Sequence, residues 1–144
     1  MWADTLLSLE RGHLLRLALW AGACTLSGTS LLAWLLVRRT SAPLLRHFAI
    51  QTAAWGAVNL AIVAWAWQGL AYRDYAAAQR LLNVLWLNTG LDAGYAAVGI
   101  TLAVTAWRWG RRPGGVGAGL GVLVQGVALA LLDLRLIAVI GPLQ

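Results

Sequence analysis

The chain has 144 residues, of which 60% are hydrophobic and only 11% are charged, whereas about 25% of the residues in a soluble globular domain are charged. Its mean hydropathy is +0.72. These values exclude an ordinary soluble domain and predict one integral membrane domain over residues 1–144. The net charge of +6 would suggest nucleic acid in a soluble chain. Here the arginines mostly lie between apolar segments, where they set topology and meet lipid headgroups. We therefore expect membrane lipid as a partner and no nucleic acid.

Four apolar segments follow a short helical lead-in at the membrane interface, residues 4–13. Each segment exceeds the roughly 20 residues that a helix needs to cross about 30 Å of hydrocarbon. Helices also satisfy their own backbone polar groups in lipid. The sequence therefore predicts an all-α, four-helix transmembrane bundle, which two tandem helical hairpins could form. The predicted helices cover about residues 14–37, 47–70, 81–107 and 114–140.

Arginines and helix breakers mark the connections between these segments. Pro43 and Pro113 lie at the expected starts of the second and fourth helices. The connections 38–46 and 108–113 carry six arginines and no acidic residue, against four arginines in the N-terminal flank and the second connection. The positive-inside rule then places these two connections in the cytoplasm and both termini outside. We expect a multi-pass protein of the bacterial inner (plasma) membrane.

A weak internal repeat is visible when the first half of the sequence is laid over the second. One alignment places Gln51 on Gln125 and Asn59 on Asp133. Two repeated two-helix units would be related by an axis along the membrane normal. Low-complexity apolar sequence also produces such matches by chance, so the repeat and the chance match remain alternatives.

Polar residues interrupt the apolar segments and are the candidates for a ligand- or ion-binding site. Asn88, Asp92 and Tyr95 are spaced by four and three residues, so a helix presents them as one stripe. Other polar residues occupy overlapping depths in the second and fourth segments: Asn59, Gln125 and Asp133. A carboxylate is costly to bury in hydrocarbon, so such groups face the bundle interior. We predict that all six residues form one interior cluster.

Each member of this cluster also has a purely structural interpretation. Amides and glycines often serve helix packing, and Gly90 and Gly94 would let a neighbouring helix approach the stripe. The two aspartates could instead form structural ion pairs. Arg16, near the same membrane face, and Arg135, two residues after Asp133, are the available charge partners. The binding and the structural interpretations remain open at this point.

The histidines and the single cysteine argue against a metal or haem site. His13 precedes the first span and His47 begins the second, so antiparallel helices place them about 30 Å apart. Cys24 is the only cysteine, which excludes an intramolecular disulfide and a thiolate cluster. Glu10 and His13, three residues apart, are expected to form a solvated interfacial pair. We predict no metal, no cofactor and no catalytic residue, while a bound lipid or apolar ligand is compatible with the composition.

Four short motifs lie within about residues 48–133: Trp55-Gly56-Ala57-Val58-Asn59, Asn88-x-Gly90-Leu91-Asp92-x-Gly94-Tyr95, Gln125-Gly126 and Leu132-Asp133. Together they resemble a family of bacterial four-helix membrane proteins known only as a domain of unknown function. The resemblance implies a four-helix membrane protein without assigning an activity.

Three classes of function follow from this composition. The first is a non-enzymatic binding module or accessory subunit of a membrane complex, built around the buried polar cluster. The alternative is a small oligomeric proton- or cation-linked transporter or channel that uses Asp92, because four helices alone enclose little volume. The third is an intramembrane enzyme in which Asp92 and Asp133 act as paired carboxylates. In the first two classes we expect a homo-oligomer or a larger membrane complex.

Overall fold

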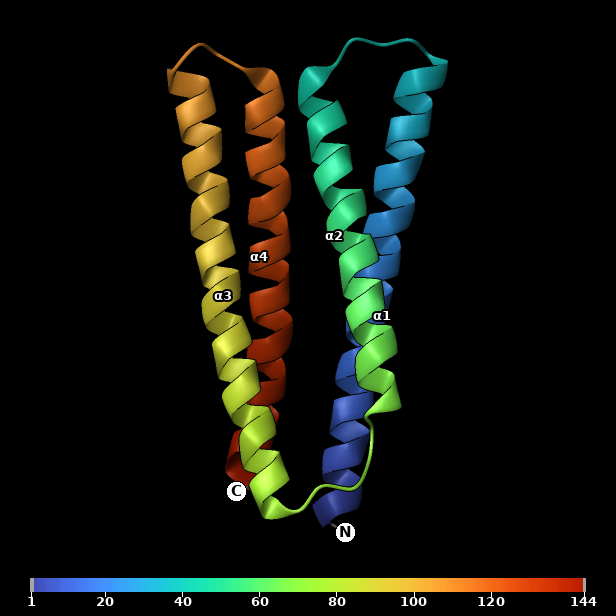
Figure 1. Cartoon of the computed structure of the whole chain (residues 1–144), viewed down its shortest axis with the longest axis vertical. Coiled ribbons are helices and arrows are strands. Elements are labelled where there is room, and N and C mark those ends of the chain that lie inside the picture. Colours follow the sequence, from blue (N-terminus) through green and yellow to red (C-terminus); the bar gives the residue numbers. More distant parts are fainter. Residues whose placement is uncertain (1, 144) are drawn as a thin grey trace.

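The computed structural model describes residues 2–143 and is built from four long helices (Figure 1). They are α1 (Trp2–Val37), α2 (Pro43–Gln68), α3 (Tyr75–Arg108) and α4 (Pro113–Ile140), followed by the short 3-10 helix η1 (Gly141–Leu143). No strand occurs within the described residues. The predicted all-α, four-helix class is thereby confirmed. The lead-in at residues 4–13 forms the first turns of α1 without a break.

Local sequence explains where the helices begin. Pro43 and Pro113 are the first residues of α2 and α4, where a missing backbone N–H costs nothing and φ is already suited to a helix. Asp74 caps α3, because its carboxylate accepts a hydrogen bond of 2.7 Å from the Ala77 backbone. The turns after α1 and α3 each contain an arginine with positive φ, 49° at Arg39 and 47° at Arg111.

The four helices form two tandem hairpins, α1–α2 and α3–α4, that use the same close contacts. A Cβ on Gly56 of α2 would lie 2.6 Å from the backbone nitrogen of Thr25 in α1. A Cβ on Gly126 of α4 would lie 2.7 Å from the backbone nitrogen of Ala96 in α3. The backbones of each hairpin therefore touch at a glycine. Gly56 and Gly126 are equivalent positions of the two hairpins, as are Thr25 and Ala96.

A second pair of glycines gives the same alignment of the hairpins. A Cβ on Gly28 would lie 2.6 Å from the nitrogen of Ala53, and one on Gly99 would lie 2.5 Å from the nitrogen of Leu123. The hairpins are therefore structural repeats, with Gly28 equivalent to Gly99 and Ala53 to Leu123.

The alignment that the sequence suggested is wrong for α2 and α4. It paired Gln51 with Gln125, whereas the glycine contacts pair Gln51 with Gly121 and Trp55 with Gln125. The difference is about one helical turn, so similar residue types were matched one turn out of register.

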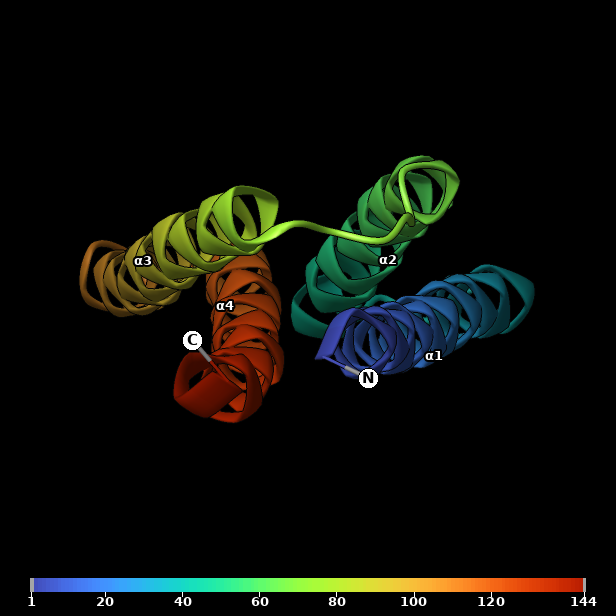
Figure 2. The same ribbon diagram turned by 90° about the horizontal axis from the view of Figure 1, so that it is seen from below.

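The two hairpins are arranged around an approximate two-fold axis along the bundle. Figure 2 shows α2 and α4 near the centre and α1 and α3 on the outside. The symmetry is incomplete, because α1 packs against α4 whereas α2 and α3 scarcely touch. We call the end of the bundle with both chain termini the terminal end, and the end with the α1–α2 and α3–α4 turns the turn end (Figure 1).

The buried apolar core lies at the terminal end. It joins the start of α1, the start of α3 and the end of α4, and consists of Leu6, Ala78, Leu85, Leu136, Ile137 and Ile140. Elsewhere the helices meet largely through small residues, and many large apolar side chains stay exposed, among them Leu19, Leu45, Val98 and Leu131. The core therefore holds α1, α3 and α4 together at the terminal end, while α2 stays outside it.

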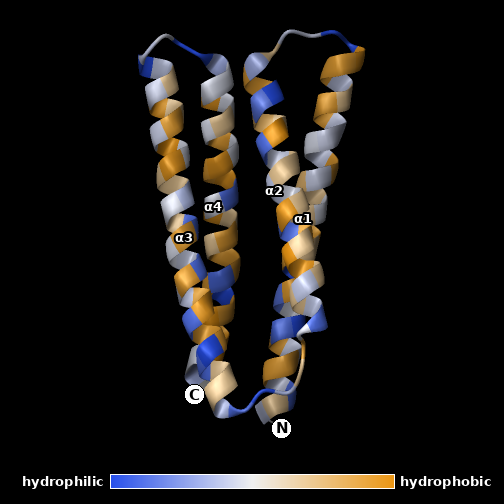
Figure 3. Cartoon of the chain, viewed as in Figure 1, coloured by the Kyte–Doolittle hydropathy of each residue, from blue (hydrophilic) through white to orange (hydrophobic). Residues whose placement is uncertain are grey.

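Three helices are long and apolar enough to cross a membrane: α1, α2 and α4. Within the described residues α3 does not reach that level, although it has 34 residues, because it is the least apolar of the four. Figure 3 shows hydrophilic residues at the helix ends and within the lower part of the bundle, which is its terminal end. Hydrophilic residues of α3 thus lie at the same level of the bundle as hydrophilic residues of its neighbours.

Candidate functional site: a cleft between the hairpins

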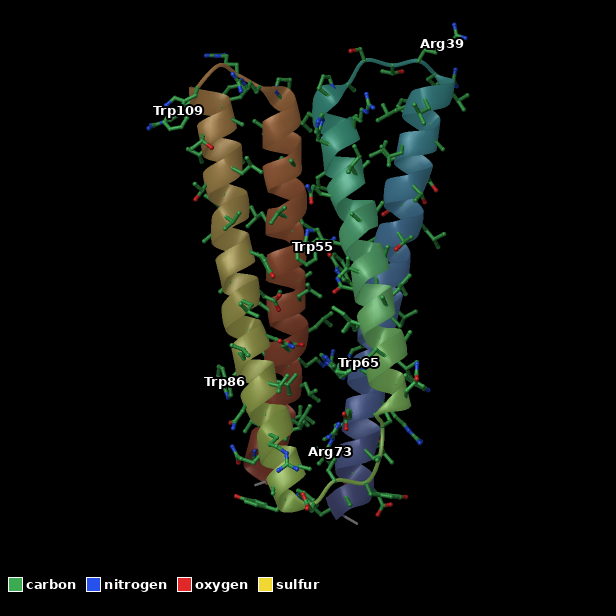
Figure 4. The ribbon with its side chains drawn as sticks, in the orientation of Figure 1. Arg39, Trp55, Trp65, Arg73, Trp86 and Trp109 are labelled. Atoms are coloured by element: carbon green, nitrogen blue, oxygen red, sulfur yellow. The ribbon has the colours of Figure 1, made fainter. Side chains whose placement is uncertain are left out.

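A cleft of about 920 Å³ opens between α2 and α3 on the side where the two helices do not pack. Its walls are mainly apolar residues of α2 and α3, and its floor is formed by α1 and α4. It extends from Trp55 in the middle of α2 to Arg73 in the α2–α3 connection. Figure 4 shows Trp55 at mid-height between the hairpins and Arg73 near the terminal end.

Two aromatic rings close the cleft at its mid-bundle end. Trp55 and Tyr95 meet edge to face, with ring centroids 5.0 Å apart and an interplanar angle of 63°, a favoured geometry for aromatic pairs. In the repeat, Trp55 is equivalent to Gln125 and Tyr95 is equivalent to Cys24. Two large rings thus occupy the α2–α3 interface where the α1–α4 interface has smaller groups.

The equivalent α1–α4 interface is closed by hydrogen bonds. The Trp20 indole N–H donates to Gln125 Oε1 over 3.1 Å, and Gln125 Nε2 donates to Cys24 Sγ over 3.3 Å. Gln125 is therefore a buried residue that joins α4 to α1, and it does not line the cleft. The predicted cluster of six residues accordingly divides, with Gln125 on one interface and the others along the cleft.

A histidine and a carboxylate form part of the cleft floor. His13 Nε2 of α1 lies 3.3 Å from Asp133 Oδ1 of α4, and both side chains are buried. The other ring nitrogen, His13 Nδ1, has no hydrogen-bond partner in the structure. The expectation that Glu10 and His13 form a solvated pair is wrong. Both residues are buried, because α1 starts at Trp2 and its first turns pack inside the bundle.

Two further polar side chains face the cleft without partners. Asp92 of α3 is 7% exposed and makes no hydrogen bond or ion pair with the residues between 2 and 143. Asp133 lines the same cleft, so the site contains two carboxylates. Asn59 of α2 is only 3% exposed, and its Nδ2 has no hydrogen-bond partner. Buried polar groups almost always have a hydrogen-bond partner. The Asp92 carboxylate, an acceptor, and Asn59 Nδ2, a donor, both lack one within the described residues.

An ion pair spans the terminal end of the cleft. Arg73 in the α2–α3 connection donates from Nε to Glu10 Oε2 over 2.9 Å and from Nη2 to Glu10 Oε1 over 2.5 Å. This two-pronged contact raises the pKa of the Arg73 guanidinium above its usual range. Figure 2 shows the connection crossing between α2 and α3 at this end. The charge of Arg73 is therefore neutralised locally and fixes the connection to α1.

The remaining sequence candidates have simpler positions. Asn88 and Tyr95 are exposed residues on the cleft wall. Neither Arg16 nor Arg135 forms an ion pair with an aspartate within the described residues, and the position beside Asp133 belongs to His13. A Cβ added to Gly90 or Gly94 would meet no atom of another helix within 4 Å, so no neighbouring helix packs closely against these glycines.

Sequence reasoning did not place Glu10, His13 and Arg73 in this site. The available signal was the spacing of three residues between Glu10 and His13, which puts both on one face of a helix. Their position before the first apolar segment suggested solvent instead. The decisive contacts, from Glu10 to Arg73 and from His13 to Asp133, join residues that are far apart in the sequence.

Taken together, the fold and the cleft define a four-helix bundle of two repeated hairpins with an open, partly polar cleft between them. Residues 16–134 match the model of DUF6992, a family of unknown function, so the chain belongs to that family. The match confirms the resemblance to an uncharacterised family and extends it into α1. No curated protein and no solved structure matches the chain.

Proposed function

We propose that this protein is a small, non-enzymatic bacterial membrane protein that binds an amphipathic molecule in the cleft between α2 and α3. It acts as a binding module or as an accessory subunit of a membrane complex. The observation that carries the proposal is the combination of largely apolar walls with a few buried polar side chains that have unmet hydrogen-bonding groups. Ligand sites characteristically combine apolar surface with a few convergent polar groups.

Insertion in a membrane is supported by the length and composition of α1, α2 and α4. All four helices expose large apolar side chains, which lipid covers more favourably than water does. Helix α3 completes the bundle in this proposal, with Asn88, Asp92 and Tyr95 lining the cleft. The exposed apolar faces also offer contacts for a second copy or for another membrane subunit.

The shape of the cleft supports an occupant that enters from the lipid. The opening lies between α2 and α3, along the side of the bundle, so an acyl chain can enter without leaving the hydrocarbon. A volume near 920 Å³ falls within the range of about 300–1,000 Å³ that small-molecule sites occupy. The Trp55–Tyr95 contact limits the cleft at mid-bundle, which favours a binding site over a continuous channel.

Filling the cleft is expected to remove the bound molecule. Val84 lines the cleft and is 51% exposed, so Val84→Trp adds bulk there without disturbing the core. Val98→Trp is the matched control on α3, because Val98 is 58% exposed and lies outside the cleft. Native mass spectrometry of protein extracted in mild detergent should show a bound amphiphile on the wild type and on Val98→Trp. The amount bound to Val84→Trp should be at least ~10-fold lower. Absence of any adduct, or equal loading of both variants, would contradict the proposal.

The proposed orientation places the terminal end outside the cytoplasm, following the arginine distribution. Cys24 is buried, so single cysteines can be introduced against a low background. An impermeant maleimide added to intact cells should label Ala71→Cys in the α2–α3 connection and leave Thr40→Cys unlabelled until the membrane is permeabilised. The reverse pattern would place the connections 38–46 and 108–113 outside.

Proton- or cation-linked transport by an oligomer is the second candidate function. It is favoured by the lack of any partner for Asp92 among the described residues, since unpaired intramembrane carboxylates often carry protons or cations. A flux driven by a pH gradient in proteoliposomes, lost in Asp92→Asn, would favour this candidate. Absence of flux together with a retained amphiphile would favour the binding module.

A further inference from the structure

Building on the proposed binding function, we infer that the occupant's head group is a primary or secondary ammonium that carries a hydroxyl or carbonyl oxygen close by. A long-chain amino alcohol has this chemistry. The inference rests on four side chains of the cleft: Asn59, Asp92, His13 and Asp133.

The carboxylate of Asp92 can accept hydrogen bonds from a donor that enters the cleft. It is buried and no residue between 2 and 143 donates to it. A buried charge is stable when it is paired and hydrogen-bonded. An ammonium with N–H groups satisfies both conditions, whereas a quaternary ammonium supplies charge without a donor. The head group should therefore be a protonated amine.

The other charges facing the cleft favour a cation as well. Asp133 adds a second carboxylate at the floor, next to His13. The charge of Arg73 is matched by that of Glu10. Arg80 also lines the cleft, but it is exposed near the terminal end. The deep part of the cleft thus holds two carboxylates, of which only Asp133 has a histidine beside it, and this excess of acidic groups disfavours phosphate, sulfate and carboxylate head groups.

Asn59 specifies the second feature of the head group. Its Nδ2 is buried, donates to no residue in the structure and belongs to a side chain that lines the cleft. An amide N–H without an acceptor in a desolvated site costs free energy. An oxygen next to the amine would accept from Asn59 while the amine donates to Asp92. A simple alkylamine satisfies only one of the two groups.

Binding of short amphiphiles to the full chain in lipid nanodiscs tests the inference. The probes share one chain length and differ in the head group: 2-amino-1-dodecanol, dodecylamine, dodecyltrimethylammonium, dodecanol and dodecyl sulfate. Calorimetric titration, corrected with empty nanodiscs, should give saturable binding of the two primary amines. The amino alcohol should bind about 10-fold more tightly than dodecylamine, and the other three should not saturate.

Variants assign the two contacts separately. Asp92→Asn should weaken binding of both amines by about 10- to 100-fold. Asn59→Leu should weaken binding of the amino alcohol by about 10-fold and so remove its preference over dodecylamine. Asp74→Asn is the charge-matched control outside the cleft, because asparagine also caps a helix. The comparison of probes on the wild type holds even if a variant fails to fold.

The outcomes separate this inference from the proposed function. If dodecanol or dodecyl sulfate binds as tightly as the amines and Val84→Trp abolishes that binding, the cleft binds amphiphiles but the ammonium assignment is wrong. Amines that bind equally to the wild type and to Asp92→Asn also overturn the assignment. If no probe binds saturably, both the assignment and the proposed function fail.

Discussion

Gly126→Leu is expected to separate α4 from α3 and destabilise the second hairpin by about 3 kcal/mol or more. A Cβ at this position would lie 2.6 Å from the carbonyl oxygen of Asp92 and 2.7 Å from the nitrogen of Ala96. Both atoms belong to the backbone of a continuous helix, so neither can move aside as a flexible side chain could. The two helices must therefore move apart, and packing is lost along their shared interface.

Gly94→Leu provides the control for this substitution. Gly94 lies in the same hairpin, on α3, and a Cβ there meets nothing within 4 Å. Removing a helix-interior glycine generally stabilises a helix by up to about 1 kcal/mol, so Gly94→Leu should be neutral or slightly stabilising. Unfolding in mixed micelles of dodecyl maltoside and SDS, followed by circular dichroism, gives the free energies of both variants. If Gly126→Leu and Gly94→Leu lowered the free energy of unfolding by similar amounts, the close α3–α4 contact at Gly126 would not be the cause of the loss.

His13→Leu is expected to destabilise the bundle by about 3 kcal/mol, through the carboxylate that it leaves behind. An interhelical hydrogen bond in a membrane contributes only about 0.6 kcal/mol on average, so loss of the bond alone would be a small effect. The larger cost arises because Asp133 remains buried without its partner, in a cleft that the Asp92 carboxylate also lines. The unpaired carboxylate, rather than the lost contact, dominates the expected result.

A double-mutant cycle distinguishes these two costs. The double variant His13→Leu/Asp133→Leu removes the unpaired carboxylate and should recover most of the stability lost in His13→Leu. Measurements in the same mixed micelles give the coupling free energy directly. A double variant as unstable as the sum of both single variants would mean that His13 and Asp133 act independently, against the 3.3 Å contact between them.

The division of the predicted polar cluster has a simple geometric origin. Gln125 and Asp133 are eight residues apart, which is about 2.2 helical turns. Their side chains therefore point in directions that differ by about 80° around α4. Gln125 meets Trp20 and Cys24 of α1, whereas Asp133 reaches the cleft floor. The depth of each side chain and the angle between the two follow from the sequence. Which neighbouring helix each side chain meets was decided only by the tertiary structure.

The repeat shows the same division between local and tertiary information. Matching residue types across low-complexity apolar sequence paired Gln51 with Gln125, one helical turn away from the pairing that the glycine contacts give. Pro43 and Pro113, which start α2 and α4, carried the correct alignment in the sequence. Helix starts and backbone contacts locate equivalent positions better than similar side chains do, because they are set by the geometry of the chain.

The sequence by itself determined the four helices, because run length, prolines and arginine-rich connections are local properties of the chain. It also indicated that Asp92, Asn59 and Asp133 lie at overlapping depths. Only the tertiary structure decided that a cleft exists and on which side. The approximate two-fold symmetry makes the α1–α4 and α2–α3 interfaces equivalent, yet Gln125 and Cys24 join the first pair of helices. Two large rings, Trp55 and Tyr95, occupy the same positions at the second. Side-chain size affects the spacing of two helices only where the fold brings them together. No local sequence pattern therefore predicts the cleft.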